Sequence, residues 1–353
     1  MSTELEAAIA AGYGFDAPGI TFGAAMAGEE ALPAAAVRVP LQMMNRHGLV
    51  AGATGTGKTK TLQVLAEQLS DAGVPVFISD IKGDISGLAA PAALNDKLTG
   101  RANAIGFTDY APKSFPVEFM TLDRGGTGVR LRASVSSFGP ILMSKVLDLN
   151  ETQQSVLALA FKYADDKRLA LLNLDDLRAL LNHLNSDEGR SEMAEYGGVA
   201  TATVGVIVRK IVELEQQEAD AFFGSPEFDV ADFLRVGEDG RGVISILELA
   251  DMQDRPALFS TFMMWLLASL YESLPEVGDP DRPKLVFFFD EAHLLFRDAN
   301  KTFMHQIELV ARLIRSQGRG RLLRDPRADR RAGGGARPAG QPGAACAARL
   351  HAR

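Results

Sequence analysis

The 353-residue sequence predicts an α/β fold with a mainly parallel β-sheet and a helical insertion. Short apolar runs, typical of buried strands, alternate with longer stretches in which apolar residues recur every three or four positions, as in helices. Strands separated by helices favour a parallel sheet that is covered on both faces. Hydrophobic residues make up 46% of the chain and charged residues 23%, so a sizeable core is possible.

The elements were assigned from periodicity and from turn residues. The segments expected to be strands are 47–51, 76–79, 115–122, 129–135, 243–247 and 284–289, with a turn at 124–126 joining the third to the fourth. The segments expected to be helices are 59–72, 151–164, 173–185, 201–222, 256–274 and 303–316. The resulting division is an N-terminal segment of low periodicity (1–40), a first core part (41–139), a helical insertion (140–235), a second core part (236–318) and a tail (319–353).

Composition narrows the class of protein. The net charge of −8 argues against a surface coated for nucleic-acid binding, although it permits a locally basic channel. The single cysteine, Cys346, excludes an intrachain disulfide framework and fits a reducing compartment. Residues 1–11 lack the basic start of a signal peptide, and apolar runs such as 285–289 are too short to span a bilayer. A cytoplasmic protein without a membrane partner is therefore expected.

A glycine-rich loop carries the strongest chemical signal. Gly52-Ala53-Thr54-Gly55-Thr56-Gly57-Lys58-Thr59 matches the pattern G-x-x-x-x-G-K-[ST] in full. Backbone N–H groups of such a loop cradle phosphates, the lysine reaches the β- and γ-phosphates, and the hydroxyl ligates Mg²⁺. A chance glycine-rich turn is the alternative, but an apolar run before the loop and a helix after it favour a phosphate site. The residues expected to contact ATP are Gly52, Thr54, Gly55, Thr56, Gly57, Lys58, Thr59 and Lys60.

A second acidic element follows the apolar run 284–289. Asp290 and Glu291 come directly after it, so a parallel sheet would present both carboxylates at the edge where ligands bind. Asp290 is expected to hold Mg²⁺ together with Thr59, and Glu291 to orient and deprotonate the attacking water. A core strand that ends in solvated acids is the alternative for this motif taken alone.

Three further features allow either a role at the nucleotide or a purely structural role. The segment 79–84, Ser-Asp-Ile-Lys-Gly-Asp, follows a strand and would lie near the nucleotide or a neighbouring subunit, or be a plain polar loop. Arg312 and Arg315 lie about one turn apart on the expected last helix, where a neighbour could use them on the nucleotide, or where they are simply solvated. His293 could sense the γ-phosphate or serve as a supporting residue.

Together these motifs resemble a known family. The segments that carry the resemblance are 45–48, 52–59, 80–84, 149–153, 222–224, 288–293 and 312–316. They resemble the HerA-like bacterial ATPases of the FtsK–HerA superfamily, in particular the YjgR-type branch, over about residues 20–318. The resemblance implies a RecA-like core, a homo-oligomeric, hexameric ring and translocation of double-stranded DNA. The resemblance also favours Arg315 over Arg312 as the arginine finger. The expected catalytic residues are then Lys58, Glu291 and Arg315.

The tail departs from this family. Residues 319–353 contain nine arginines against Asp325 and Asp329, a net charge of +7, which leaves −15 for the rest of the chain (−8 − 7). Composition alone predicts that residues 319–353 form a disordered basic tail. The resemblance instead implies that another core strand, ending in a polar sensor residue, follows Gly318.

A change of reading frame explains the departure better. One permitted set of codons for 319–326, read one base later, encodes Val-Gly-Val-Tyr-Phe-Val-Thr, which resembles the missing strand and sensor. Residues 341–349, read with the same shift, also give family-like sequence. We therefore interpret the residues from about Arg319 onward as the product of a frameshift in the gene or in its sequencing.

The expected function is a Mg²⁺-dependent motor ATPase of the DNA-translocase or helicase type. The expectation that DNA is the substrate rests mainly on the resemblance, since the sequence shows no helix-turn-helix, zinc finger or basic-aromatic stripe. The alternatives are an ATPase that acts on protein partners and a nucleotide-binding chain with little turnover. A GTPase is disfavoured because no Asn-Lys-x-Asp motif is found.

Overall fold

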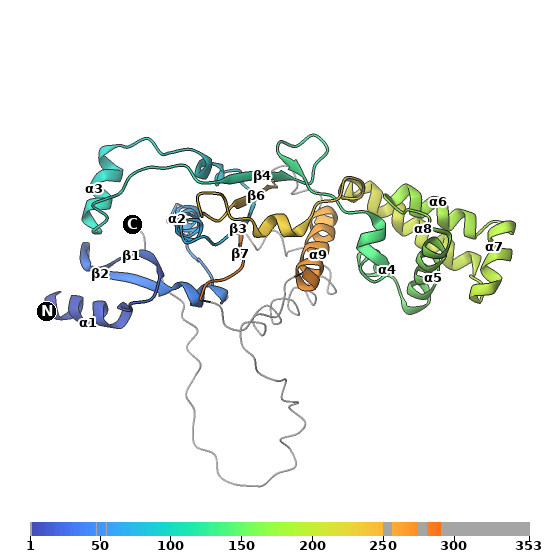
Figure 1. Cartoon of the computed structure of the whole chain (residues 1–353), viewed down its shortest axis with the longest axis horizontal. Helices are drawn as coiled ribbons and strands as arrows, with labels where there is room; N and C mark the ends of the chain where they lie inside the picture. The colour runs from blue at the N-terminus through green and yellow to red at the C-terminus, as the bar shows by residue number, and fades with distance from the viewer. Residues whose placement is uncertain (1, 47, 54, 250–255, 274–280, 291–353) are drawn as a thin grey trace, which may run out of the picture.

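The computed structural model describes residues 2–46, 48–53, 55–249, 256–273 and 281–290 (Figure 1). Its centre is a five-stranded sheet in the order β5-β4-β6-β3-β7. The strands are β3 (Val76–Asp80), β4 (Val117–Thr121), β5 (Val129–Arg130), β6 (Ile244–Glu248) and β7 (Val286–Phe289). Every pairing in this sheet is parallel. The predicted parallel α/β sheet is therefore confirmed, and the carboxyl ends of its strands share one edge.

Alternating side chains place the sheet between two apolar layers. Ile78 and Ile246 pack into a core with Leu65 and Leu69 of helix α2 (Lys58–Asp71). Phe77 faces the other way, into a second core that includes Phe262 of helix α9 (Pro256–Ser273). Helices therefore cover both faces, as expected. None of the described helices combines the length and apolarity needed to cross a bilayer.

The strands β4 and β5 pair differently from a simple hairpin. The sequence predicted two strands joined by a turn at 124–126, and both exist in shorter form. They run parallel, with Met120 opposite Val129 and Thr121 opposite Arg130. Because β5 begins level with the end of β4, the chain need not return along the whole strand, and a short loop is enough.

The N-terminal segment is more regular than its sequence indicated. Helix α1 (Ser2–Tyr13) is followed by an antiparallel pair, β1 (Gly19–Ala27) and β2 (Glu30–Pro40), and by the short helix η1 (Leu41–Asn45). Two hydrogen bonds join this pair to α2: the Thr21 N–H donates to Gln68 Oε1, and Gln68 Nε2 donates to the Thr21 carbonyl, each over 2.8 Å. The pair thereby lies against the outer side of α2 rather than extending the central sheet.

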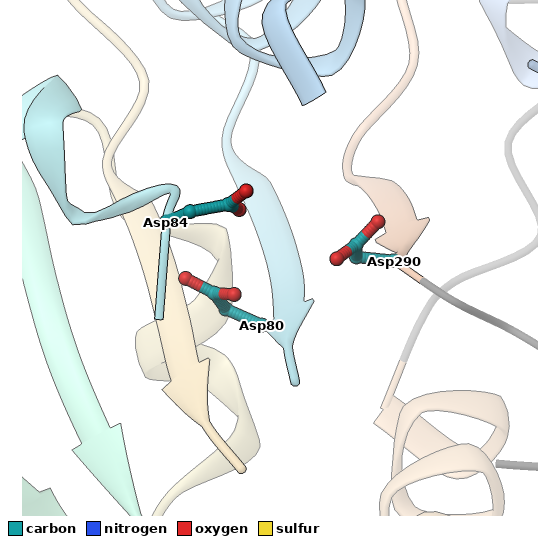
Figure 2. A group of neighbouring side chains, drawn as sticks. All are labelled: Asp80, Asp84 and Asp290. Atoms are coloured by element: carbon teal, nitrogen blue, oxygen red, sulfur yellow. The ribbon is translucent and has the colours of Figure 1, made fainter. Parts of the chain in front are cut away.

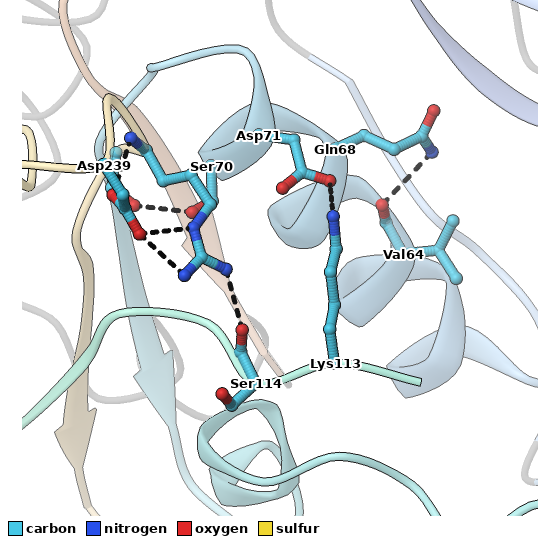
Figure 3. Close-up of polar contacts among 9 residues, drawn as sticks. Val64, Gln68, Ser70, Asp71, Lys113, Ser114 and Asp239 are labelled. Atoms are coloured by element: carbon cyan, nitrogen blue, oxygen red, sulfur yellow. Dashed lines mark hydrogen bonds and ion pairs between the residues drawn. The ribbon is translucent and has the colours of Figure 1, made fainter. Parts of the chain in front are cut away.

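Polar contacts hold the far end of α2 in place (Figure 3). The buried Ser70 hydroxyl donates to the Gly242 carbonyl over 2.6 Å, directly before β6. Lys113 forms an ion pair of 2.6 Å with Asp71, and Arg241 donates to the Ser114 carbonyl over 2.8 Å. These contacts fix the C-terminal end of α2 to the entrances of β4 and β6, so its N-terminal end has a defined position over the sheet.

Helices connect β5 to β6 and gather on one side of the sheet (Figure 1). They are α4 (Val135–Val146), α5 (Glu151–Lys167), α6 (Leu174–Leu184), α7 (Asp187–Met193) and α8 (Thr201–Gln216), with the short turns η3 (Ala194–Tyr196), η4 (Ala219–Phe222) and η5 (Val230–Leu234). Side-chain caps at Asn150 and Asn173 fix the starts of α5 and α6 through reciprocal hydrogen bonds with residues three positions on. The expected helices at 151–164 and 173–185 are confirmed. The third ends at Gln216, earlier than the predicted residue 222.

Candidate functional site

The phosphate-loop motif lies directly before α2. The helix begins at Lys58, behind Gly57, whose φ of 96° lies in the left-handed region that favours glycine. Gly55 has a φ of 79° and needs the same freedom. Gly52 lies close to Thr56, since a Cβ there would lie 2.4 Å from Thr56 Oγ1 and that side chain would have to move. The glycines of the motif therefore fit the conformation that the loop adopts.

The residues before the loop differ from the prediction. The sequence predicted a strand over 47–51, but the described part, residues 48–51, belongs to no strand. Leu49, an apolar residue of this segment, is 85% exposed. An apolar segment forms a strand only where a neighbour offers backbone partners, and none of the described strands pairs with this segment.

The loop folds back on its own lysine. Lys58 Nζ donates to the carbonyls of Gly52 and Ala53 over 2.9 and 3.1 Å. The Thr56 hydroxyl donates to the Ala53 carbonyl over 2.8 Å. The ammonium group is therefore held inside the curve of the loop. Thr54 lies outside the described residues.

The first turn of α2 offers unsatisfied N–H groups to an anion. The N-cap Gly57 provides no side-chain hydrogen bond to this turn, and the first N–H groups of any α-helix have no partner within it. The positive end of the helix dipole points in the same direction. Loop, lysine and helix start thus form an arrangement suited to phosphate oxygens.

Asp80 organises the loop after the neighbouring strand. It is the last residue of β3 and is completely buried. Its Oδ1 accepts hydrogen bonds from the N–H groups of Lys82 and Gly83 over 3.1 and 2.8 Å, and its Oδ2 accepts one from Ile85 N–H over 2.9 Å. Both carboxylate oxygens of Asp80 therefore shape the loop 81–85.

This loop touches the start of α2. The Thr59 hydroxyl donates to Asp84 Oδ2 over 3.3 Å. Gln63, 7% exposed, donates from Nε2 to the Asp84 carbonyl over 3.1 Å. Lys60 Nζ in turn donates to Gln63 Oε1 over 2.7 Å. A chain of side-chain contacts thus ties the turn after β3 to the first two turns of α2.

Asp290 completes an acidic group at the sheet edge (Figure 2). It follows β7, is buried, and its backbone N–H donates to the Ser79 carbonyl over 3.2 Å. In the described part of the chain, carboxylate oxygens of Asp80, Asp84 and Asp290 all lie within 4.8 Å of one another. With the Thr59 hydroxyl alongside, the donor set consists of oxygen atoms only, which suits a hard cation such as Mg²⁺.

The structure thus brings together residues that are far apart in sequence. Thr59 and Asp290, both predicted magnesium ligands, both lie near Asp84: the Thr59 hydroxyl donates to it over 3.3 Å, and carboxylate oxygens of Asp84 and Asp290 lie within 4.8 Å of each other. The side chain of Lys60 lies against Gln63 instead of in the loop. The predicted site residues outside the described part of the chain are Thr54, Glu291, His293, Arg312 and Arg315.

The sequence placed the segment 79–84, which contains Asp80 and Asp84, near the nucleotide or a neighbouring subunit, but it assigned no role to either carboxylate and missed Gln63 altogether. A signal was available: Asp80 and Asp84 follow a buried strand at the carboxyl edge of the sheet, where ligands bind. Gln63 gave no signal, because a polar residue within a helix is ordinary until its partner is known.

Comparison with known proteins places the chain among P-loop proteins. A family model described as "Helicase HerA-like C-terminal" matches residues 27–323, and no curated protein matches the chain. Among solved structures, the bacterial conjugative coupling protein TrwBdeltaN70 with sulphate is 19% identical, with 87% of this chain and 68% of that chain covered and a TM-score of 0.49. VirB4 of Thermoanaerobacter pseudethanolicus is 14% identical, with 85% and 75% covered and a TM-score of 0.43.

A third structure is the plasmid coupling protein TrwB in complex with ADP and Mg²⁺, 15% identical, with 83% of this chain and 73% of that chain covered and a TM-score of 0.45. The family match spans most of the chain, from before the glycine-rich loop to beyond Asp290. The chain therefore belongs to the helicase HerA-like C-terminal family, and its parallel α/β core is the fold class that the sequence predicted.

Proposed function

We propose that this chain is a Mg²⁺-dependent ATPase that works as a motor on double-stranded DNA in a homo-oligomeric ring. The observation that carries the ATPase part is the proximity of Thr59, Asp84 and Asp290: the Thr59 hydroxyl donates to Asp84, and carboxylate oxygens of Asp84 and Asp290 lie within 4.8 Å of each other. A phosphate-binding loop and a distant acidic strand end meet there, as phosphoryl transfer requires. Membership of the HerA-like family supports the motor and DNA parts of the proposal.

Each residue has a chemical task in this proposal. The backbone from Gly52 to Lys60 surrounds the phosphates, and Lys58 leaves the loop carbonyls to contact the β- and γ-phosphates. Thr59 and Asp290 would hold Mg²⁺, which would supply positive charge that offsets the charge of the phosphates. Glu291 accepts the proton of the attacking water, and Arg315 of a neighbouring copy stabilises the transferred phosphoryl group.

Replacing Lys58 tests nucleotide binding. Lys58→Ala is expected to weaken binding of a fluorescent ATP analogue by about ten- to a hundredfold, because a charged hydrogen bond contributes about 1.5–3 kcal/mol. Lys97→Ala removes an exposed lysine from helix α3 (Asp96–Ala104) and is the matched control. Equal affinities of wild type and Lys58→Ala would show that the loop does not hold the phosphates.

The DNA part requires its own measurement. We expect double-stranded DNA to raise the ATPase rate of the full chain severalfold, with an effect that declines as salt increases because phosphate contacts release counterions. Single-stranded DNA and a polyanion such as heparin serve as comparisons. Stimulation by all three alike would indicate charge attraction only. An active ATPase that ignores DNA would favour the alternative function, an ATPase that acts on protein partners.

A further inference from the structure

Asp84 occupies a position that the phosphate-loop pattern does not assign. The pattern names the loop, Lys58 and Thr59, and a distant acidic strand end supplies Asp290. Asp84 belongs to neither element, yet its Oδ2 lies 3.3 Å from the Thr59 hydroxyl oxygen and within 4.8 Å of a carboxylate oxygen of Asp290. Figure 2 shows its carboxylate directed into the space beside Asp290.

We propose that Asp84 is a positioning residue that orients the Thr59 hydroxyl for magnesium, and that buried Asp80 sets its place. A hydroxyl has one hydrogen and two lone pairs. When Asp84 accepts that hydrogen, the lone pairs of Thr59 are left for a cation. The inference rests on the proposed function, since it concerns how the same site binds Mg²⁺ with nucleotide.

The hydrogen bonds within the turn 80–85 fix the position of Asp84. Three backbone N–H groups converge on the buried Asp80 carboxylate, which fixes the course of residues 81–85. Gly83 adopts a φ of 71° within this turn, a conformation that places Asp84 back toward α2. The position of Asp84 thus follows from a buried anchor rather than from the flexibility of an exposed loop.

A second tether acts on the backbone of Asp84. Gln63 donates to its carbonyl oxygen and is itself oriented by Lys60. Because α2 holds the main chain of Asp84, the carboxylate does not have to hold the turn in place. It is the exposed member of the acidic group, and its Oδ2 accepts the hydrogen of the Thr59 hydroxyl. This division of tasks is what an orienting partner of a metal ligand requires.

The test is a magnesium titration of nucleotide binding by the full chain. Asp84→Ala is expected to raise the Mg²⁺ concentration for half-maximal binding of fluorescent ADP by about tenfold, the lower end of what loss of an orienting partner costs at metal sites. ADP affinity in EDTA and the melting temperature should stay at wild-type values. Asp84→Asn, which keeps an acceptor oxygen, should retain more of the magnesium response than Asp84→Ala.

A double-mutant cycle tests the route through Thr59. If Asp84 acts through that hydroxyl, Thr59→Ala combined with Asp84→Ala should be no worse than Thr59→Ala alone. Fully additive effects would overturn the proposal, as would an unchanged magnesium response in Asp84→Ala or equal losses in Asp84→Ala and Asp84→Asn. A drop in EDTA affinity or in melting temperature that matches the magnesium effect would mean a structural role only, and would also overturn it.

The experiments distinguish a failure of this inference about Asp84 from a failure of the proposed function. Failure of the proposed function would appear in the wild-type chain as absence of nucleotide binding or of its response to Mg²⁺. Failure of the inference would leave the wild type binding Mg²⁺ and ADP, with Asp84→Ala behaving the same way. Asp109→Asn, an exposed acid in the segment before β4, is the control for loss of a negative charge.

Discussion

Replacing Glu291 with glutamine is expected to lower ATP turnover by about 10²–10⁴-fold while nucleotide affinity stays within about twofold of wild type. Gln keeps the size and shape of the side chain, but its amide cannot accept the proton of the attacking water. Glu291 itself lies outside the described residues; it directly follows Asp290, which lies at the site. A base that acts in the chemical step contributes little to ground-state binding, so turnover and affinity should separate.

Steady-state phosphate release and equilibrium titration with an ATP analogue make that separation measurable. Glu213→Gln, an exposed position on α8 in the helical insertion, is the matched control and should leave both quantities unchanged. Equal turnover in wild type and Glu291→Gln would remove Glu291 from the catalytic role. A negligible wild-type rate with intact binding would instead support a nucleotide-binding chain with little turnover, the alternative left open by the sequence.

Local signals explain which elements the sequence predicted well. The helices around 59–72, 151–164 and 173–185 carry long apolar periodicities, and side-chain caps confirm the starts of α5 and α6. The buried strands β3 and β6 are short, largely apolar runs that each end in an acidic residue, Asp80 and Glu248. In these segments each residue's preference agrees with its tertiary environment, so a single sequence is sufficient.

Non-local pairing explains the misses. β1 and β2 consist mostly of alanine, glycine and other small residues, which give little contrast between their two faces. Their register and bulges depend on pairing with each other and on the contact of Thr21 with Gln68. The parallel pairing of β4 with β5 likewise depends on where the second strand begins, which periodicity does not encode.

Part of the candidate site could likewise be predicted from the sequence, and part depends on non-local contacts. The phosphate loop is contiguous, so its residue types could be read directly from the sequence. The contact between Thr59 and Asp84 joins residues 25 positions apart and depends on the turn built around Asp80. Only the folded arrangement shows that this turn lies beside both the helix start and Asp290.

Restoring the family-like reading frame from about residue 319 is expected to raise the melting temperature by about 5 °C and turnover by about a hundredfold. Residues 319–353 lie outside the described part of the chain, and the family match ends at residue 323. In the restored frame this region supplies an apolar strand, Val-Gly-Val-Tyr-Phe-Val-Thr, that ends in a polar residue. The strand would add burial, and its polar end would add a group that contacts the γ-phosphate.

The described sheet has a place for such a strand. β7 lies last in the strand order and pairs, within the described residues, with β3. Phe287, Phe288 and Phe289 are only half-buried, whereas every residue of β3 is buried. The apolar segment 48–51 belongs to no strand, with Leu49 exposed. A strand paired with β7 would cover its phenylalanines and offer the segment before the phosphate loop a neighbour to pair with.

The comparison needs three chains: the sequence as given, the frame-restored chain, and a chain that stops at Gly318. The third separates the gain of a strand from the loss of a harmful basic tail. If the strand is the cause, the chain that stops at Gly318 should melt and turn over like the given sequence, and only the restored chain should improve. Equal melting temperatures and rates in all three would contradict the prediction that the restored strand stabilises and activates the chain. A gene in which no single-base change near codon 318 restores that frame would contradict the frameshift interpretation itself. An improvement already present at Gly318 would assign the defect to the nine arginines of the tail, whose charge would then compete with Lys58 for the phosphates.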